Sequence, residues 1–212
     1  LFEKYGYEKT QVIVSTHSTH VSSASKIRSV NILSKGYQEA HVYQPSIGLE
    51  EHECDRIERY LDAVRSTLLF AKGIMIAEGD AEMLLIPTLV KKVFGISLDE
   101  LGVSLINMGS TVFQNIAKIF HETRVQRNCA IITDLDESIY ELPEDSDDDD
   151  IDQKKSRKSQ VAGEQRKEKL ESFCDGNDYV NAFFANHTFE VDFLLSNNSR
   201  EIVNTLHNVY KM

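Results

Sequence analysis

Three short apolar runs, separated by helix-like segments, constrain this chain more than any other feature of its sequence. They occupy residues 73–77, 103–107 and 129–133, with the sequences GIMIA, VSLIN and CAIIT. Short runs that are apolar at almost every position are typical of strands buried on both faces. Because helix-like segments separate them, they predict an α/β fold in which a parallel sheet is flanked by helices. Residues 179–185 and 187–195 return to apolar patterning and are predicted to add strands to the same sheet.

The segment between the first two runs predicts a helix with clear end signals. Asp80 is expected to cap its N-terminus, Pro87 to kink it and Gly95 to end it. A turn at residues 109–110 then leads to a second predicted helix over residues 111–122. The apolar face of the first helix is expected to consist of Leu85, Leu89 and Val93.

The N-terminal part of the chain predicts a separate small unit. Residues 11–15 are expected to form a buried strand, and residues 29–35 and 40–45 to form two more strands. A helix is predicted over residues 50–70, where it bridges this unit and the sheet. Leu1 already lies in a helix-like stretch, which indicates a fragment of a longer polypeptide.

A charged segment interrupts the pattern after the third apolar run. Residues 144–152 hold seven acidic side chains and residues 154–169 hold seven Lys or Arg, so the net charge of −11 is strongly segregated. We expect a mobile acidic insertion at about 141–160, followed by a helix over 161–174. The basic stretch is compatible with contact to a DNA backbone and equally with an exposed charged helix.

Cysteine usage and hydropathy restrict the cellular setting. Cys54, Cys129 and Cys174 are odd in number and show no CxxC spacing, which favours reduced thiols over disulfides or a zinc site. No apolar run approaches the roughly 18 residues that a membrane-spanning helix needs. The sequence therefore predicts a cytoplasmic protein without a membrane partner.

Four acidic residues follow the first and third predicted strands. Glu78 comes directly after the first run, Glu82 lies four residues later, and Asp134 and Asp136 follow the third run. Ligands of α/β proteins bind where the carboxyl ends of parallel strands meet, so these side chains are expected to converge. An all-oxygen set suits Mg²⁺ or Mn²⁺, and two such ions can activate water for phosphodiester hydrolysis. An ExxxE or DxD spacing by itself is common on solvated surfaces and seldom marks a site. The position of both spacings directly after apolar strands is what favours a metal site.

Three ordered motifs resemble the Toprim domain of the overcoming-lysogenization-defect (OLD) nucleases, the family that includes the nuclease subunit of Gabija-type anti-phage systems. The motifs are IMIAEGDAEMLLIPTL, SLINMGS and AIITDLDES, and the resemblance covers roughly residues 60–195. It implies a Toprim nuclease domain over residues 71–212. It also places Glu78, Gly109 and the pair Asp134 and Asp136 at the family's motif positions.

The same resemblance implies further site residues. Glu82 matches a second glutamate of the OLD type, and Glu190 corresponds to a later acidic ligand, with Asp192 as the alternative. OLD-type nucleases also have a lysine beyond this residue. The candidate here is Lys211, whose context does not match, so the position of that lysine stays open.

The opening residues resemble the end of the ABC-type ATPase that precedes Toprim in OLD proteins. QVIVSTHSTHVSS then implies that residues 1–48 are an ATPase remnant, that residues 49–70 are a linking helix, and that His17 senses a nucleotide's terminal phosphate. A histidine in a Ser/Thr-rich turn is the plainer alternative. The sequence has no GxxxxGK[ST] loop, so ATP is expected only through a missing upstream portion.

The function implied by these features is a divalent-metal-dependent DNA endonuclease or nickase, coupled to an upstream ATPase and active in anti-phage defence. Its implied partners are DNA, further copies of the full-length protein and a partner defence protein. Two alternatives stay open: a non-catalytic, metal-binding interaction module, and a Toprim domain of the topoisomerase or primase type.

Overall fold

The structure is a computed structural model that describes residues 12–36, 38–62, 65–109 and 113–210. Its strands are β1 (Ile32–Lys35), β2 (Ala40–Tyr43), β3 (Gly73–Ala77), β4 (Val103–Asn107), β5 (Cys129–Asp134) and β6 (Val180–Ala185). Its α-helices are α1 (Thr19–Ser23), α2 (Glu51–Tyr60), α3 (Asp80–Phe94), α4 (Leu98–Leu101), α5 (Phe113–Ala117), α6 (Ile151–Cys174), α7 (Phe189–Phe193) and α8 (Ser199–Tyr210). The described elements also include the 3-10 helices η1 (Ile27–Ser29), η2 (Arg65–Leu69) and η3 (Ser146–Asp148). They are completed by η4 (Leu194–Asn198), a kinked segment between α7 and α8 in which Ser196 and Asn197 are not helical.

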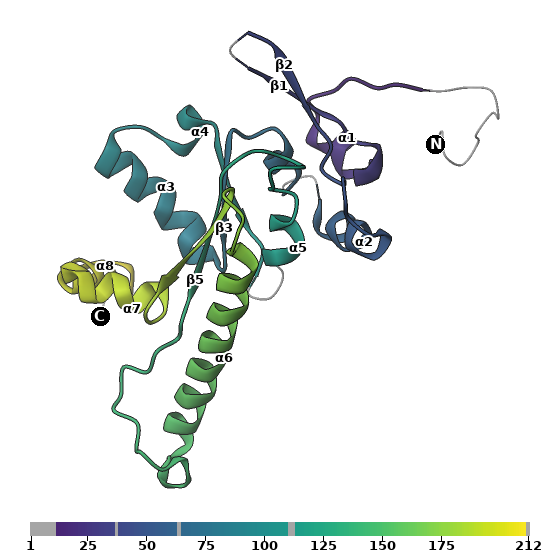
Figure 1. Ribbon diagram of the computed structural model, residues 1–212. Helices are drawn as coiled ribbons and strands as arrows, with labels where there is room; N and C mark the ends of the chain where they lie inside the picture. The colour runs from purple at the N-terminus through teal and green to yellow at the C-terminus, as the bar shows by residue number, and fades with distance from the viewer. Residues whose placement is uncertain (1–11, 37, 63–64, 110–112, 211–212) are drawn as a thin grey trace.

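Four parallel strands form the main sheet, in the order β4-β3-β5-β6. Figure 1 shows α3 and α4 on one side of this sheet and α5 and α6 on the other. The predicted α/β fold, with a parallel sheet flanked by helices, is therefore confirmed. Because the four strands run in one direction, their carboxyl ends at Ala77, Asn107, Asp134 and Ala185 lie along one edge of the sheet.

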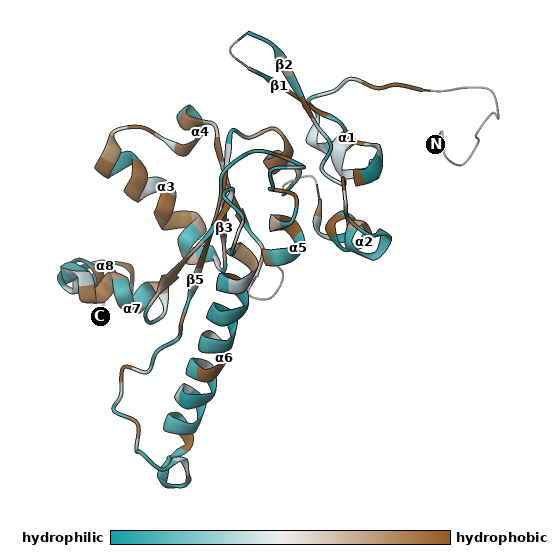
Figure 2. Ribbon diagram, in the orientation of Figure 1, coloured by the Kyte–Doolittle hydropathy of each residue, from teal (hydrophilic) through white to brown (hydrophobic). Residues whose placement is uncertain are grey.

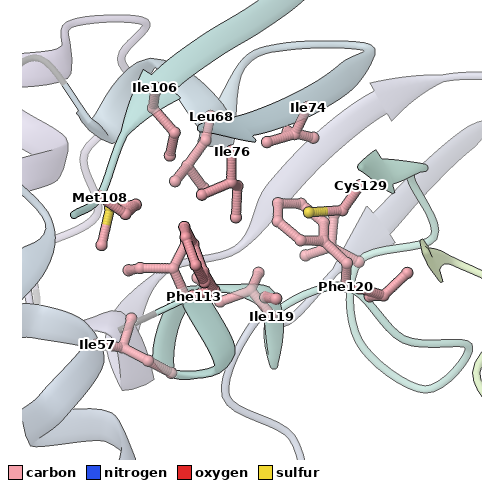
Figure 3. Close-up of a cluster of buried hydrophobic side chains, with 14 of the residues drawn as sticks. Ile57, Leu68, Ile74, Ile76, Ile106, Met108, Phe113, Ile119, Phe120 and Cys129 are labelled. Carbon is pink, nitrogen blue, oxygen red and sulfur yellow. The ribbon is translucent and has the colours of Figure 1, made fainter. Parts of the chain in front are cut away.

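The largest part of the core lies between the sheet and the segment that contains α5. Figure 3 shows Phe113, Ile119 and Phe120 facing the strand residues Ile76 and Ile106, and all five are at most 2% exposed. A fully buried side chain of this size contributes roughly 1.5–3 kcal/mol relative to an exposed one. This cluster holds the central strands in place, and it also includes residues of the preceding segments, namely Ile27, Ile32, Ile57 and Leu68.

Several local predictions are confirmed. The three apolar runs form β3, β4 and β5, residues 179–185 contain β6, and β1 and β2 form an antiparallel hairpin. The helix α3 continues through Pro87 and ends at Gly95, which has a φ of 74°. The N-cap is Gly79 rather than Asp80, which is the first helical residue.

The predicted strand over residues 11–15 is wrong for its described part. Residues 12–18 contain no strand, and Val12, Ile13 and Val14 are 46%, 87% and 62% exposed. A buried strand needs a neighbour that satisfies its backbone N–H and C=O groups. No strand of the described ranges pairs with this segment. Gln11 and the helix-like start of the chain lie outside the described residues.

Two predicted helices are shorter than expected. In place of one helix over residues 50–70, α2 ends at Tyr60, and the chain continues into η2 after residues 63–64, which are outside the described part. The helix predicted over 111–122 ends at Ala117. There the chain turns so that Phe120 forms an isolated bridge with Val125, and both side chains enter the core.

The helix predicted over residues 161–174 begins ten residues earlier, so the segment predicted to be mobile is in part helical. Asp150 and Gln153 form a capping box at its start, which satisfies free N–H groups of the first turn. Figure 2 shows that α6 is mainly hydrophilic and extends away from the sheet. The prediction failed because helix capping, and not an apolar face, defines this half of α6.

The last predicted strand, over residues 187–195, is wrong. This segment forms α7 and the start of η4. Thr188 is the N-cap of α7, and the side chain of Asp192 accepts the N–H groups of Asn186 (2.9 Å) and His187 (3.4 Å). These contacts close a turn directly after β6, which leaves the chain no extended path along the sheet.

No helix of the described ranges combines the length and the apolar character that crossing a membrane requires.

Candidate metal centre

Glu78 and Asp134 lie side by side at the carboxyl ends of the two central strands. The register pairs Ala77 of β3 with Ile132 of β5, which brings Glu78 next to Thr133. The buried Thr133 hydroxyl donates a hydrogen bond of 2.5 Å to Oε2 of Glu78. This bond fixes the orientation of the Glu78 carboxylate toward β5.

Glu82 enters the same region from the first turn of α3. Its side chain bends back over the strand-to-helix turn, since a Cβ added to Gly79 would lie 3.0 Å from Glu82 Oε2. Glu82 is only 3% exposed, and this burial, together with the negative charges of Glu190 and Glu78, raises the pKa of its carboxyl. Glu82 is therefore close enough to both residues to share a site with them.

Asp134 carries the largest described perturbation among the site carboxyls. Burial and the charges of Glu78, Glu82 and Asp136 raise its pKa to about 7, although a hydrogen bond from the Phe189 N–H to Oδ2 (3.2 Å) acts in the opposite direction. The site thus concentrates more negative charge than its surroundings compensate, and a cation would relieve this repulsion.

Glu190 reaches the group by a different route from the one predicted. It lies in the first turn of α7, is exposed, and contributes to the raised pKa of Glu82. The alternative, Asp192, is engaged in the turn between β6 and α7. Of the two candidates, the structure brings Glu190 toward the other carboxylates.

The sequence reasoning missed Arg166 of α6. Its Nη1 lies 3.6 Å from Glu78 Oε1, and its Nη2 lies 3.0 Å from Asp136 Oδ2. Nη2 also donates to the main-chain oxygen of Asp134 at 2.5 Å. The Arg166 side chain is 17% exposed, so a nearly buried guanidinium occupies the space among these acidic groups.

Gly163, one turn earlier in α6, allows Arg166 to come this close. A Cβ at Gly163 would lie 1.9 Å from the main-chain oxygen of Leu135, so α6 packs directly on the backbone between Asp134 and Asp136. Asp136 itself has a φ of 55°, in the left-handed region that few non-glycine residues adopt. An isolated glycine within a charged helix was the sequence signal for this close approach.

The donor chemistry of the group fits a hard divalent cation. In the described part of the chain, no three His, Cys, Asp or Glu side chains are already arranged to enclose one ion. The carboxylates of Glu78 and Asp136 nevertheless pair with one positively charged group, the guanidinium of Arg166, so their oxygens face a common positive charge. Carboxylate oxygens are the ligands that Mg²⁺ and Mn²⁺ prefer.

Other predicted residues lie elsewhere or outside the described ranges. Gly109 has a φ of 64°, and its N–H donates to Oδ1 of Asn107, whose side-chain amide donates to Asp80 at 2.8 Å. This turn borders the same edge of the sheet. His17 is exposed in the irregular segment before α1. Lys211 lies outside the described residues.

Comparison with known families identifies the central part of the chain. Residues 69–136 match the family model described as "Overcoming lysogenization defect protein-like, TOPRIM domain". This segment is an OLD-like Toprim domain. The match contains Glu78, Glu82, Asp134 and Asp136, and it ends before Arg166 and Glu190.

Solved structures of OLD proteins are among those similar to this chain. The C-terminal region of the Xanthomonas campestris pv. campestris OLD protein is 20% identical, with a TM-score of 0.41, and 67% of this chain and 63% of that chain are covered. For the C-terminal region of the Burkholderia pseudomallei OLD protein, the identity is 23%, the TM-score is 0.42, and 66% of each chain is covered. The chain thus spans less than two thirds of these relatives. The comparison with curated proteins gave no match.

Proposed function

We propose that this chain is part of an OLD-type DNA endonuclease or nickase that depends on a divalent metal. The observation that carries the proposal is the convergence of Glu78, Glu82 and Asp134 at the carboxyl edge of the Toprim sheet. There burial and the neighbouring negative charges raise the pKa of the Glu82 and Asp134 carboxyls, and a cation would relieve this repulsion. Toprim domains generally bind divalent metal ions, which supports the same chemistry.

In this proposal the metal ligands are Glu78, Glu82, Asp134, Asp136 and Glu190. One or two Mg²⁺ or Mn²⁺ ions would activate water and stabilise the leaving oxygen of a phosphodiester. The protein orients its own carboxylates for this chemistry, since the Thr133 hydroxyl holds Glu78 and the Phe189 N–H holds Asp134. Because a phosphate would otherwise be repelled by these carboxylates, cutting is expected to require added metal.

The proposal extends to the protein of which this chain is part. There the Toprim domain is coupled to an upstream ABC-type ATPase, and His17 senses the terminal phosphate of ATP. The assembly is a cytoplasmic homo-oligomer that acts on DNA in anti-phage defence, with a partner defence protein. These statements rest on the OLD-like identity of residues 69–136.

The test is nicking of supercoiled plasmid by the full-length protein with Mg²⁺ or Mn²⁺. Glu78→Gln and Asp134→Asn are expected to abolish nicking, because each removes a charged ligand while keeping the shape of the side chain. Asp99→Asn is the matched control, since Asp99 is exposed on α4, which precedes β4 and so lies at the opposite edge of the sheet. This control should cut as the wild type does.

Two other outcomes would favour the alternatives. Metal binding that depends on Asp134, without cleavage of any DNA form, would indicate a non-catalytic Toprim module. Topoisomer ladders or nucleotide incorporation would indicate a topoisomerase- or primase-type domain. Failure of the full-length protein to cut any DNA with either metal would refute the nuclease proposal.

A further inference from the structure

α6 brings a positive charge to the carboxylates that the proposed function assigns to a metal. Arg166 contacts Glu78 through Nη1 at 3.6 Å and Asp136 through Nη2 at 3.0 Å. The two contacts come from the two terminal nitrogens of one guanidinium. Its planar fork therefore bridges the carboxylates that follow β3 and β5.

We propose that Arg166 is an internal cation that competes with a divalent metal ion for Glu78 and Asp136, so that α6 sets the metal affinity of the site. The inference rests on the proposed function. A carboxylate oxygen that accepts from a guanidinium cannot give the same lone pair to an ion, and the two positive charges repel each other at short range. Metal binding therefore requires that Arg166 give up at least one of these contacts.

The contacts of Arg166 are those of an exchangeable counter-ion rather than of a fully satisfied structural anchor. Its buried Nε has no hydrogen-bond partner in the described part of the chain. Its Nη2 is shared between Asp136 and the main-chain oxygen of Asp134. A buried arginine with an unsatisfied donor is held mainly by the negative charge around it, and this attraction weakens when a metal neutralises that charge.

The helix can stay in place while the guanidinium moves. Gly163 packs on the backbone of Leu135, which fixes α6 against the end of β5. Arg166 projects from the same side of the helix one turn later, and its long side chain can rotate without displacing this contact. The exchange between guanidinium and metal is thus local to one side chain.

The experiment is calorimetric titration of Mn²⁺ into the full chain, with no DNA present. Arg166→Met keeps much of the side-chain length and removes the charge, and it is expected to bind Mn²⁺ about tenfold more tightly than the wild type. Arg166→Lys keeps one charge without the fork, and a smaller gain is expected. Lys158→Met controls for the loss of a distant charge, since Lys158 is exposed two turns earlier in α6, and it should bind as the wild type does.

The outcomes separate this inference from the proposed function. If neither the wild type nor the Arg166 variants bind Mn²⁺, or if Asp134→Asn leaves the binding unchanged, the proposed function and the inference both fail. If the wild type shows Asp134-dependent binding and Arg166→Met binds equally or more weakly, only the inference fails. Should Arg166→Met not fold, as judged by circular dichroism, Arg166→Lys decides by the same criterion. A wild-type crystal structure with Mn²⁺ at Asp134 in which Arg166 still bridges Glu78 and Asp136 would also overturn it.

Discussion

Gly163→Ala tests whether the packing of α6 on the end of β5 builds the site. The added Cβ would lie 1.9 Å from the main-chain oxygen of Leu135 and 2.5 Å from its carbonyl carbon. Real Cβ atoms essentially never approach other atoms within 3.0 Å. Since the obstructing atoms belong to backbone and not to a flexible side chain, α6 and residues 134–136 must separate by roughly 1 Å or more.

The magnitude follows from two opposing effects. Alanine is favoured over glycine within a helix by about 1 kcal/mol. Overpacking costs typically about 1–3 kcal/mol, and the displaced helix also weakens the charge-assisted bond from Arg166 to Asp136, which costs a further 1.5–3 kcal/mol or so. Together these contributions leave a net destabilisation of about 1.5–5 kcal/mol. For a chain of this size each kcal/mol lowers the melting temperature by roughly 2–4 °C, so it should fall by roughly 3–20 °C.

The measurement is urea unfolding followed by circular dichroism, together with thermal melting. Ser159→Ala is the matched control, because Ser159 lies one turn earlier in α6 and is exposed. It should be as stable as the wild type or slightly more so. If Gly163→Ala were also as stable as the wild type, or more stable, α6 would not rest on Leu135, and the placement of Arg166 would lose its basis.

Three further predictions concern charged groups around the sheet and α6. The folded-state pKa of Asp134 is about 7, above its ordinary value of 3.8. Between these two pH values, and without metal, the folded state keeps a proton that the unfolded state releases. The stability of the wild type therefore falls as the pH rises from about 4 to about 7. In EDTA, the stability of Asp134→Asn relative to the wild type should therefore grow between pH 4 and 7, by on the order of 3 kcal/mol in urea titrations; a constant difference would contradict this. Glu82→Gln removes a carboxylate that is 3% exposed and whose pKa is raised by burial. At pH 8 without metal it should therefore stabilise the fold by on the order of 1 kcal/mol. A loss of stability would show that burying this charge does not cost free energy. Arg157→Met breaks the bonds from Arg157 to Asp149 (2.6 and 2.8 Å) and to the Pro143 carbonyl, which hold residues 143–149 against α6. A glutamate-specific protease should therefore cleave residues 141–150 faster in this variant than in the control Lys154→Met, whose lysine is exposed. Equal cleavage rates would show that these bonds do not hold the segment.

The sheet and its carboxylates were predictable because the information is local. An apolar run such as residues 129–133 determines a buried strand by itself, and a parallel arrangement then brings the residues after each strand to one edge. Glu78 and Asp134 therefore lie together, as the sequence predicted. Their roles as ligands remain a prediction, since placement alone does not measure binding.

The error over residues 187–195 has a tertiary cause. The alternation of apolar and polar residues in this segment has the period of a strand and predicts one, whereas Glu190 is a site residue only through the family resemblance. A short helix forms instead because Asp192 accepts two N–H groups of the turn after β6, and the first N–H of α7 bonds to Asp134. Glu190 still approaches Glu82, by way of a helix that no local pattern indicated.

Arg166 shows why the charged segment could not be interpreted from composition. Seven basic residues over 154–169 look alike in the sequence, yet their surroundings differ. Lys158 is exposed, Arg157 pairs with Asp149 beside the start of the helix, and Arg166 meets the carboxylates of the sheet. Only contacts across the fold distinguish these roles, and Gly163 was the single local sign of them. Since ion pairs hold α6 both near its start and at the candidate metal centre, the segment first interpreted as an insertion contributes directly to the electrostatics of that centre.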